Sequence, residues 1–263
     1  MNVTSLFDGL WHDYTSRLAP SALRIHQLLT EDEPLINDHI ALRTFNCEGI
    51  GLSSLAQHFL DLGYFEGGSY VFTGKKLQAK HFEHPDLTLP KVFISELEVE
   101  KCSQTLQGII EKLVAPLPAG FLQSPAALFS GRPWSLSFAD YQTLAAESEY
   151  AAWLAAHGYG ANHFTVSVNQ LTQFTEVSEV NSFLARQGFS INAVGGEVKG
   201  GAEVYLAQSS TMADRVPVSF DDGVHDIPGG FYEFAKRYPL SNGQLYTGFV
   251  EASADKIFQS TDR

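Results

Sequence analysis

The spacing of apolar and polar residues changes along the chain between the period of a helix and the period of a strand. Apolar residues recur at helical spacing over residues 1–30, with a break near Pro20. Residues 38–46 alternate between two faces, as in a strand, and residues 51–63 form a short amphipathic helix that ends at a glycine. Turn residues then separate three more predicted strands, 64–72, 76–84 and 91–99. This part of the chain predicts a β-α-β-β-β order.

The same order returns after a helix-rich insert. Residues 102–114 and 138–157 are predicted helices, and the proline-rich stretch 116–133 between them is a predicted loop. A strand at 162–170, a helix at 175–188 and strands at 189–198, 202–210 and 231–238 follow. His39 and His163, at the heads of equivalent strands, lie 124 residues apart, and the helix-to-strand joints at Gly63 and Gly188 lie 125 apart. This nearly constant offset indicates an internal duplication.

The duplication predicts an α+β fold in a single domain of 263 residues. Two βαβββ modules, approximately residues 35–98 and 160–240, would form curved mixed sheets that face each other around a shared cleft. Added helices would lie at the N-terminus and in the insert, approximately residues 99–158. Apolar residues make up 44% of the chain, which is enough for a sizeable core.

Composition excludes several classes of protein. A net charge of −13 argues against a nucleic-acid surface, which needs clustered Lys and Arg. No apolar run reaches the roughly 18 residues that span a bilayer, and the N-terminus has no basic start followed by an apolar run, so neither a membrane span nor a secretory signal is expected. The two cysteines, Cys47 and Cys102, form no CxxC pair, so a disulfide framework or a cysteine-type zinc site is not expected. These features predict a cytoplasmic protein.

Two of the nine histidines stand out as candidate metal ligands. His39 and His163 each follow an Asx residue, Asp38 or Asn162, at equivalent strand starts of the two modules. Facing strands would bring both side chains into one cleft, and neutral imidazole is a common ligand for iron, zinc and related metals. The alternative is that both histidines only hydrogen-bond nearby loops, and the pattern leaves the two readings open.

Glu233 favours the metal reading. It lies between Phe231 and Ala235 on one face of an apolar strand, where an ionised carboxylate is costly unless it is paired or coordinates a metal. Lys236 or Arg237 could pair with it, but neighbouring strand residues point in other directions. Two histidines and one carboxylate form the triad suited to non-haem Fe(II) oxygen chemistry. Zinc hydrolases use the same residue types, so the triad alone does not name the metal.

Arg43 is a candidate for binding an acidic substrate. It shares a strand face with His39, about 13 Å further along. A buried guanidinium needs an anion, and its planar fork matches a carboxylate. An internal ion pair with an Asp or Glu is an equally open alternative. His225 and Asp226 are predicted to lie in a loop that could cover the site. No GxSxG motif is present, so a serine hydrolase is not supported.

Several segments together resemble one enzyme family. They are HIALR at His39–Arg43, the strand KVFISEL, the run from Arg132 to Trp153, NHFTVSV around His163 and GGFYEFA around Glu233. The resemblance is to the 2-oxoadipate dioxygenase/decarboxylase family, also called hydroxyglutarate synthase, a branch of the vicinal-oxygen-chelate superfamily. It runs over roughly residues 5–250, and the paired βαβββ modules of that superfamily match the duplication.

The resemblance implies that His39, His163 and Glu233 hold Fe(II), with no catalytic residue beyond the metal site. His39 and Arg43 would contact the substrate, Arg43 through a carboxylate. The reaction would convert a 2-oxo diacid such as 2-oxoadipate, with O2, to 2-hydroxyglutarate and CO2. Longer members of the family hold part of the substrate with a region near their C-terminus, whereas only 30 residues follow Glu233 here. A lyase, isomerase or hydrolase of the same fold, or a non-catalytic protein that binds small acids, stays open as an alternative.

Overall fold

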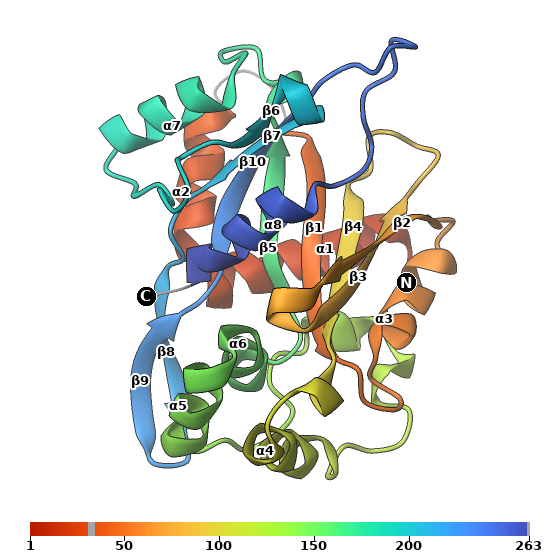
Figure 1. The fold of residues 1–263 in the computed structure, drawn as a ribbon, viewed down its shortest axis with the longest axis vertical. Coiled ribbons are helices and arrows are strands. Elements are labelled where there is room, and N and C mark those ends of the chain that lie inside the picture. Colours follow the sequence, from red (N-terminus) through yellow and green to blue (C-terminus); the bar gives the residue numbers. More distant parts are fainter. Residues whose placement is uncertain (31–34, 262–263) are drawn as a thin grey trace.

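One mixed eight-stranded sheet organises the molecule (Figure 1). The structure, a computed structural model, describes residues 1–30 and 35–261. Along the sheet the strands follow the order β2-β3-β4-β1-β5-β10-β7-β6. Their bounds are β1 Asn37–Phe45, β2 Phe65–Phe72, β3 Leu77–Glu83, β4 Lys91–Leu97, β5 Ala161–Ser167, β6 Lys199–Gly201, β7 Leu206–Ser210 and β10 Phe231–Arg237.

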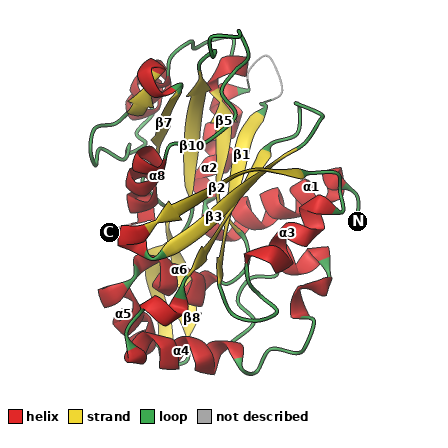
Figure 2. Cartoon of the chain, turned by 45° about the vertical axis from the view of Figure 1, so that its right-hand side comes forward, coloured by secondary structure: helices red, strands yellow, loops and turns green. Residues whose placement is uncertain are grey.

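The predicted duplication is confirmed by the pairing of the strands. In the first module β1 runs parallel to the last strand, β4, and in the second module β5 runs parallel to the last strand, β10. The two modules join edge to edge, because β1 and β5 pair as antiparallel neighbours. The cleft is therefore one face of a single twisted sheet, whose β2 and β3 turn across the upright β1, β5 and β10 (Figure 2). The prediction of two separate facing sheets differs from this arrangement.

One face of the sheet is apolar and packs against helices α1 (Val3–Asp13), α2 (Pro20–Leu29), α3 (Leu52–Leu60) and α7 (Val177–Arg186). Alternate residues of the central strands, such as Phe164 and Tyr232, point to this side, where Trp11 of α1 contacts both rings. The alternate residues of the same strands, such as Thr165 and Glu233, point to the other face of the sheet, which carries the polar side chains. In the part of the chain that the structure describes, no helix has the length and apolar character to cross a bilayer.

The insert begins with α4 (Gln104–Val114) and holds two further helices where one was predicted. The expected helix 138–157 is divided into α5 (Phe138–Glu147) and α6 (Glu149–His157). Ser148 has extended backbone angles, and its side chain accepts a hydrogen bond from the backbone N–H of Ala151, so it caps the second helix. All nine residues of α6 except Glu149 are buried, so the second helix is the one that packs into the molecule.

Two predictions in the second module are wrong. Residues 189–198 form no strand and make only an isolated bridge at Ile191, because Gly195 and Gly196 both adopt positive φ and turn the chain. His225 and Asp226 lie in a strand, β9 (Gly223–Pro228), which pairs with β8 (Arg215–Phe220) in a hairpin beside α5. A last helix, α8 (Glu251–Ile257), crosses the polar face of the sheet.

Candidate metal centre

The structure brings His39, His163 and Glu233 together on the polar face of the sheet. They lie on adjacent strands β1, β5 and β10. Thr165 stands opposite both His39 and Glu233, and directly opposite residues of paired strands share a face. All three side chains are buried, and one ligand atom from each lies within 4.8 Å of the others. This is the cluster that the sequence predicted.

The ligand atoms converge on one point. Glu233 Oε1 lies 3.5 Å from Nε2 of His39, and Glu233 Oε2 lies 3.2 Å from Nε2 of His163. The two imidazole rings are nearly perpendicular, with centroids 5.6 Å apart. Two nitrogens and a carboxylate are three of the ligands that a divalent metal takes, so further coordination positions would be left without a protein ligand, as a three-ligand catalytic metal site requires.

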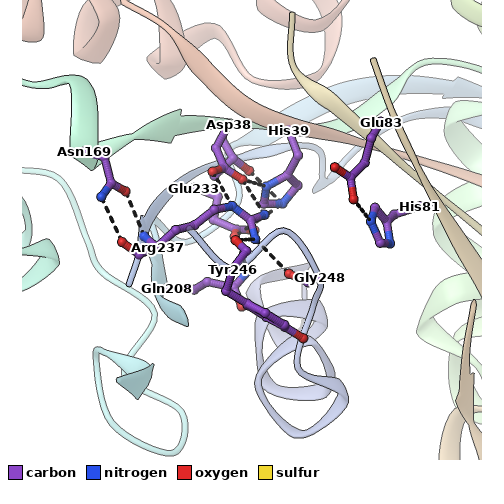
Figure 3. A network of polar contacts seen from close by, with 11 residues as sticks. Asp38, His39, His81, Glu83, Asn169, Gln208, Glu233, Arg237, Tyr246 and Gly248 are labelled. Carbon is purple, nitrogen blue, oxygen red and sulfur yellow. Dashed lines mark hydrogen bonds and ion pairs between the residues drawn. The ribbon is translucent and has the colours of Figure 1, made fainter. Parts of the chain in front are cut away.

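A buried ion pair orients the ring of His39 (Figure 3). Nδ1 of His39 donates to Oδ1 of Asp38 over 2.8 Å. Asp38 in turn accepts hydrogen bonds from Nε and Nη2 of Arg237 at 2.7 and 2.8 Å. Because an ionised carboxylate only accepts, the ring proton lies on Nδ1 and the lone pair of Nε2 points into the cleft. Burial opposes ionisation of Asp38, but the charges and hydrogen bonds of Arg237 and His39 together outweigh it and hold the pKa of Asp38 well below its usual range.

The other two ligands are oriented by amide side chains. Nδ1 of His163 lies 3.0 Å from Oδ1 of Asn162, and the ring stacks on Phe231 with centroids 4.6 Å apart. The Gln208 side chain donates from Nε2 to Oε1 of Glu233 over 2.6 Å. Each ligand thus has a partner away from the centre, the arrangement that fixes ring tautomers and carboxylate rotamers around a metal.

The chemistry of this cluster fits a cation. Burial lowers the pKa of both His39 and His163, so both rings are neutral and present lone pairs. Burial raises the pKa of Glu233 to about 8. Among the described residues no hydrogen-bond donor reaches Glu233 Oε2, which faces the lone pair of His163. Such a concentration of acceptors is costly by itself, and a divalent ion between them would relieve it.

Residues near the C-terminus cover the centre, which the sequence did not predict. Phe249 packs edge-on against His39 with ring centroids 4.8 Å apart. The backbone that leads to Phe249 is held by Arg237, which donates to the carbonyls of Tyr246 and Gly248, and by Tyr70, whose hydroxyl accepts from Phe249 N. Residues 246–261, here named the C-terminal cover, leave a cavity of about 20 Å³ at the centre. That space suits an ion or one water and is too small for a diacid.

Arg43 lies on the same face but is engaged by another side chain. Its buried guanidinium pairs through Nη1 with Oε1 of Glu149 at 3.0 Å, and it stacks near the rings of Tyr150 and Trp153. The internal ion pair that the sequence left open is therefore present. Its positive charge also contributes to the lowered pKa of His163, which places it beside the centre. The role of Arg43 in substrate binding stays a prediction.

Glu149 connects this ion pair to a larger space. Its side chain is 24% exposed and accepts a hydrogen bond from Thr261 of the C-terminal cover. Glu149 and Trp153 line a cavity of about 800 Å³ between α5, α6, the β8–β9 hairpin and the end of the chain. Two residues that contact Arg43 thus line a cavity that is large enough for a small organic acid.

The sequence reasoning missed the residues that support the ligands. Asp38 was noticed only as the neighbour of His39, and Arg237 only as a possible partner of Glu233. Gln208 carried no signal, because its contact with Glu233 depends on the pairing of β7 with β10. A recurrent Asx-His pair in equivalent positions was the one local sign that these histidines are oriented.

Comparison with known proteins gives consistent relatives. A sequence model of the family described as 2-oxoadipate dioxygenase/decarboxylase matches residues 10–116 and 126–244. The chain is 37% identical over 260 residues to the chloroplastic 2-oxoadipate dioxygenase/decarboxylase of Arabidopsis thaliana, covering 88% of this chain and 69% of the relative.

Solved structures agree in fold. The hydroxyglutarate synthase of Oryza sativa in complex with 2-oxoadipate is 34% identical, with a TM-score of 0.92 over 98% of this chain and 91% of that chain. A putative hydrolase from Shewanella frigidimarina NCIMB 400 is 56% identical, with a TM-score of 0.92 over 95% of this chain and 98% of that chain. A putative glyoxalase superfamily protein from Ralstonia eutropha JMP134, 21% identical with a TM-score of 0.78 over 93% of this chain and 84% of that chain, shares the fold and confirms the predicted fold class.

Proposed function

Because this chain belongs to the 2-oxoadipate dioxygenase/decarboxylase family, we propose that it is an Fe(II)-dependent enzyme that converts a 2-oxo diacid such as 2-oxoadipate to a 2-hydroxy acid and CO2. The observation that carries the proposal is the buried cluster of His39, His163 and Glu233, in which Nε2 of His39 and Nε2 of His163 lie 3.5 and 3.2 Å from one carboxylate. This donor set leaves positions for substrate and oxygen.

The overall reaction balances without a separate co-substrate. A six-carbon 2-oxo diacid and O2 give a five-carbon 2-hydroxy diacid and CO2, and both oxygen atoms enter the products. Bound Fe(II) would supply the electrons that activate O2 and the open positions at which a 2-oxo acid chelates. The protein would supply three ligands, a fixed orientation for the diacid and a dry site.

Each of these tasks falls to named residues. Asp38 and Asn162 hold the two imidazoles so that Nε2 of each faces the metal. Arg43 would bind the distal carboxylate, because its fork lies on the same face as the ligands and matches a carboxylate in shape and charge. Phe249 of the C-terminal cover would exclude bulk water from the reacting atoms.

Gas exchange with a panel of 2-oxo acids tests the proposal. The protein is purified anaerobically and loaded with Fe(II), and O2 consumption and CO2 release are measured with 2-oxoadipate, shorter 2-oxo diacids and 2-oxo monoacids. We expect equimolar O2 use and CO2 release with a diacid, and 2-hydroxyglutarate from 2-oxoadipate.

Three results would contradict it. Turnover that needs Zn(II) and no oxygen would indicate a hydrolase, lyase or isomerase of the same fold. Tight binding of a diacid with no metal retained would indicate a non-catalytic binding protein. Oxygen consumption with 2-oxo monoacids but not with diacids would show that Arg43 does not bind a distal substrate carboxylate.

A further inference from the structure

Lys199 is a buried cation on the polar face of the sheet, and neither the metal ligands nor their supports make use of it. It lies on β6, is 2% exposed, and stands opposite Gln208 of β7. Residues opposite each other share a face, so the side chains of Lys199 and Gln208 lie on the same side as the metal centre. Gln208 contacts Glu233 directly. Gln208 therefore lies between Lys199 and the candidate metal ligand Glu233.

The ammonium group of Lys199 is held by neutral partners. Nζ donates to the backbone carbonyls of Asn192 at 2.5 Å and Glu197 at 3.4 Å, and among the described residues no carboxylate forms an ion pair with it. The other buried cations on this face, Arg237 and Arg43, are each paired with a carboxylate. An unpaired buried charge is costly, so an anion brought near it is favoured.

Lys199 keeps its charge at neutral pH. Burial lowers its pKa to about 8, against the raising effects of Glu233 and Glu197, while Lys256 lowers it further. The pairing of Lys199 with Gln208, whose side chain bonds Glu233, places Lys199 close to the metal centre. In the strand order, Lys199 on β6 lies on the far side of the metal ligands from Arg43 on β1.

We propose that Lys199 is a specificity-determining residue whose buried charge, together with Arg43 on the opposite side, makes the metal centre select a dianionic 2-oxo acid. This inference rests on the function proposed above. A positive charge near the centre repels the divalent metal and attracts the substrate carboxylates. Lys199 should therefore weaken binding of the metal alone and strengthen binding of the diacid to the metal-loaded protein.

Two neutral substitutions test this pair of opposite effects. Lys199→Met removes the charge at similar size, and Lys199→Gln removes it while keeping a hydrogen-bond donor in case the first variant folds poorly. Lys80→Met is the control, because Lys80 is exposed and pairs with the exposed Glu66 on the far strands. Mn(II) affinity is measured first, and then the affinity of the Mn(II)-loaded protein for 2-oxoadipate without oxygen.

We expect Mn(II) binding to tighten about three-fold and 2-oxoadipate binding to weaken about ten-fold in both Lys199 variants, with neither changing in Lys80→Met. The differences in Mn(II) affinity and in 2-oxoadipate affinity between wild type and variant should shrink above about pH 8, where wild-type Lys199 loses its proton. If Lys199 had only a structural role, its substitution would not change the two affinities in opposite directions, and the differences would not disappear above about pH 8.

Two results would overturn the inference alone. These are unchanged affinities in a folded Lys199 variant, and a parallel loss of metal and diacid binding in both variants. If the wild-type Mn(II) protein itself does not bind 2-oxoadipate, the proposed function fails and this inference fails with it. The wild-type measurement therefore separates the two cases.

Discussion

At the scale of single residues, the metal centre depends on side chains that are costly to bury without their partners. His39 and His163 are useful as ligands only because Asp38 and Asn162 fix the proton on Nδ1. Glu233 is completely buried, and among the residues that the structure describes its one hydrogen-bond donor is Gln208. Three predictions follow from these contacts.

The ligands themselves are tested by truncation. We expect His163→Ala or Glu233→Ala to abolish retention of metal through gel filtration, because two remaining ligands do not hold a labile divalent ion. Elemental analysis of the purified variants measures this directly. His12→Ala, in which a helical histidine outside the cluster is removed, is the control. Unchanged metal content in either ligand variant would show that the site is elsewhere.

The support of His39 is tested by Asp38→Asn. The substitution leaves Arg237 as an uncompensated buried charge, so we expect the free energy of unfolding to fall by about 3–5 kcal/mol. Metal affinity should fall by about 10–100-fold, because Nδ1–H of His39 then has only a neutral amide oxygen as acceptor in place of a carboxylate. Urea unfolding and metal titration measure the two effects. Glu66→Gln breaks an exposed ion pair and should cost under about 1 kcal/mol.

The pH dependence follows from Glu233. Burial raises its pKa to about 8, so in the metal-free protein it is protonated at pH 7 and must release a proton when metal binds. Metal affinity should therefore rise with pH and level off above about pH 8. In the metal-free protein the stability of the folded state changes with pH in the opposite direction. The folded state holds this proton more tightly than the unfolded state, so the contribution of Glu233 falls as pH rises from about 4.5 to about 8.

Calorimetry in buffers of different ionisation enthalpy measures the proton released, and thermal unfolding of metal-free Glu233→Gln isolates the stability effect. The variant should lack the decline with pH that wild type shows. Metal binding at pH 7 without proton release would contradict the assignment.

At the scale of elements, α6 decides how Arg43 is presented. The break at Ser148 lets Glu149, Tyr150 and Trp153 surround the guanidinium of β1, so an insert that belongs to neither βαβββ module completes this side of the site. The aromatic rings keep the guanidinium in place, and the partly exposed Glu149 balances its charge.

Substitution of Arg43 tests this arrangement. We expect Arg43→Ala to raise KM for a 2-oxo diacid by about 10–100-fold, or to abolish its turnover, while metal content stays the same, because a charge-assisted hydrogen bond is lost. Steady-state kinetics with a diacid and a monoacid measure the difference. Arg43→Lys keeps the charge without the planar fork, so its KM for the diacid should lie between the values of wild type and Arg43→Ala. Equal KM values for the diacid in wild type and Arg43→Ala would make Arg43 a structural ion-pair residue.

At the scale of the whole molecule, the centre joins the two modules. His39 comes from the first module, and His163 and Glu233 come from the second, across the β1–β5 pairing. The C-terminal cover adds contacts to both halves, through Tyr70 of β2 and through Asn192 and Ser210 of the second module. A bound ion would therefore link parts of the chain that are far apart in sequence.

Metal removal tests this link. A ligand that binds only the folded state stabilises it by about 2.7 kcal/mol at 100 times its Kd, so Mn(II) should raise the unfolding temperature and a chelator should reverse the shift. Differential scanning fluorimetry measures both. Glu233→Ala should show no shift at the same Mn(II) concentration, whereas a shift of wild-type size in that variant would indicate a different binding site.

The local pattern of the sequence predicts the repeat and the three candidate ligands. Period-two alternation placed His39, Arg43 and Glu233 on their strand faces, and the constant offset between modules made His39 and His163 equivalent. These features survive in the structure because strand periodicity is a local property of the backbone. The division into one domain, the iron and the cytoplasmic location stay predictions, and the plant relatives have chloroplastic names.

The pairing of the two modules and the side chains around the candidate ligands depend on the tertiary structure and not on local sequence patterns. Edge-to-edge pairing of β1 with β5, the contact of Gln208 with Glu233, the Asp38–Arg237 pair and the cover by Phe249 all join residues that are distant in sequence. Their partners are chosen by the burial of the whole sheet, which no local pattern records. Local alternation therefore predicts the candidate ligands, whereas long-range packing sets the orientation, the charge and the burial of their side chains.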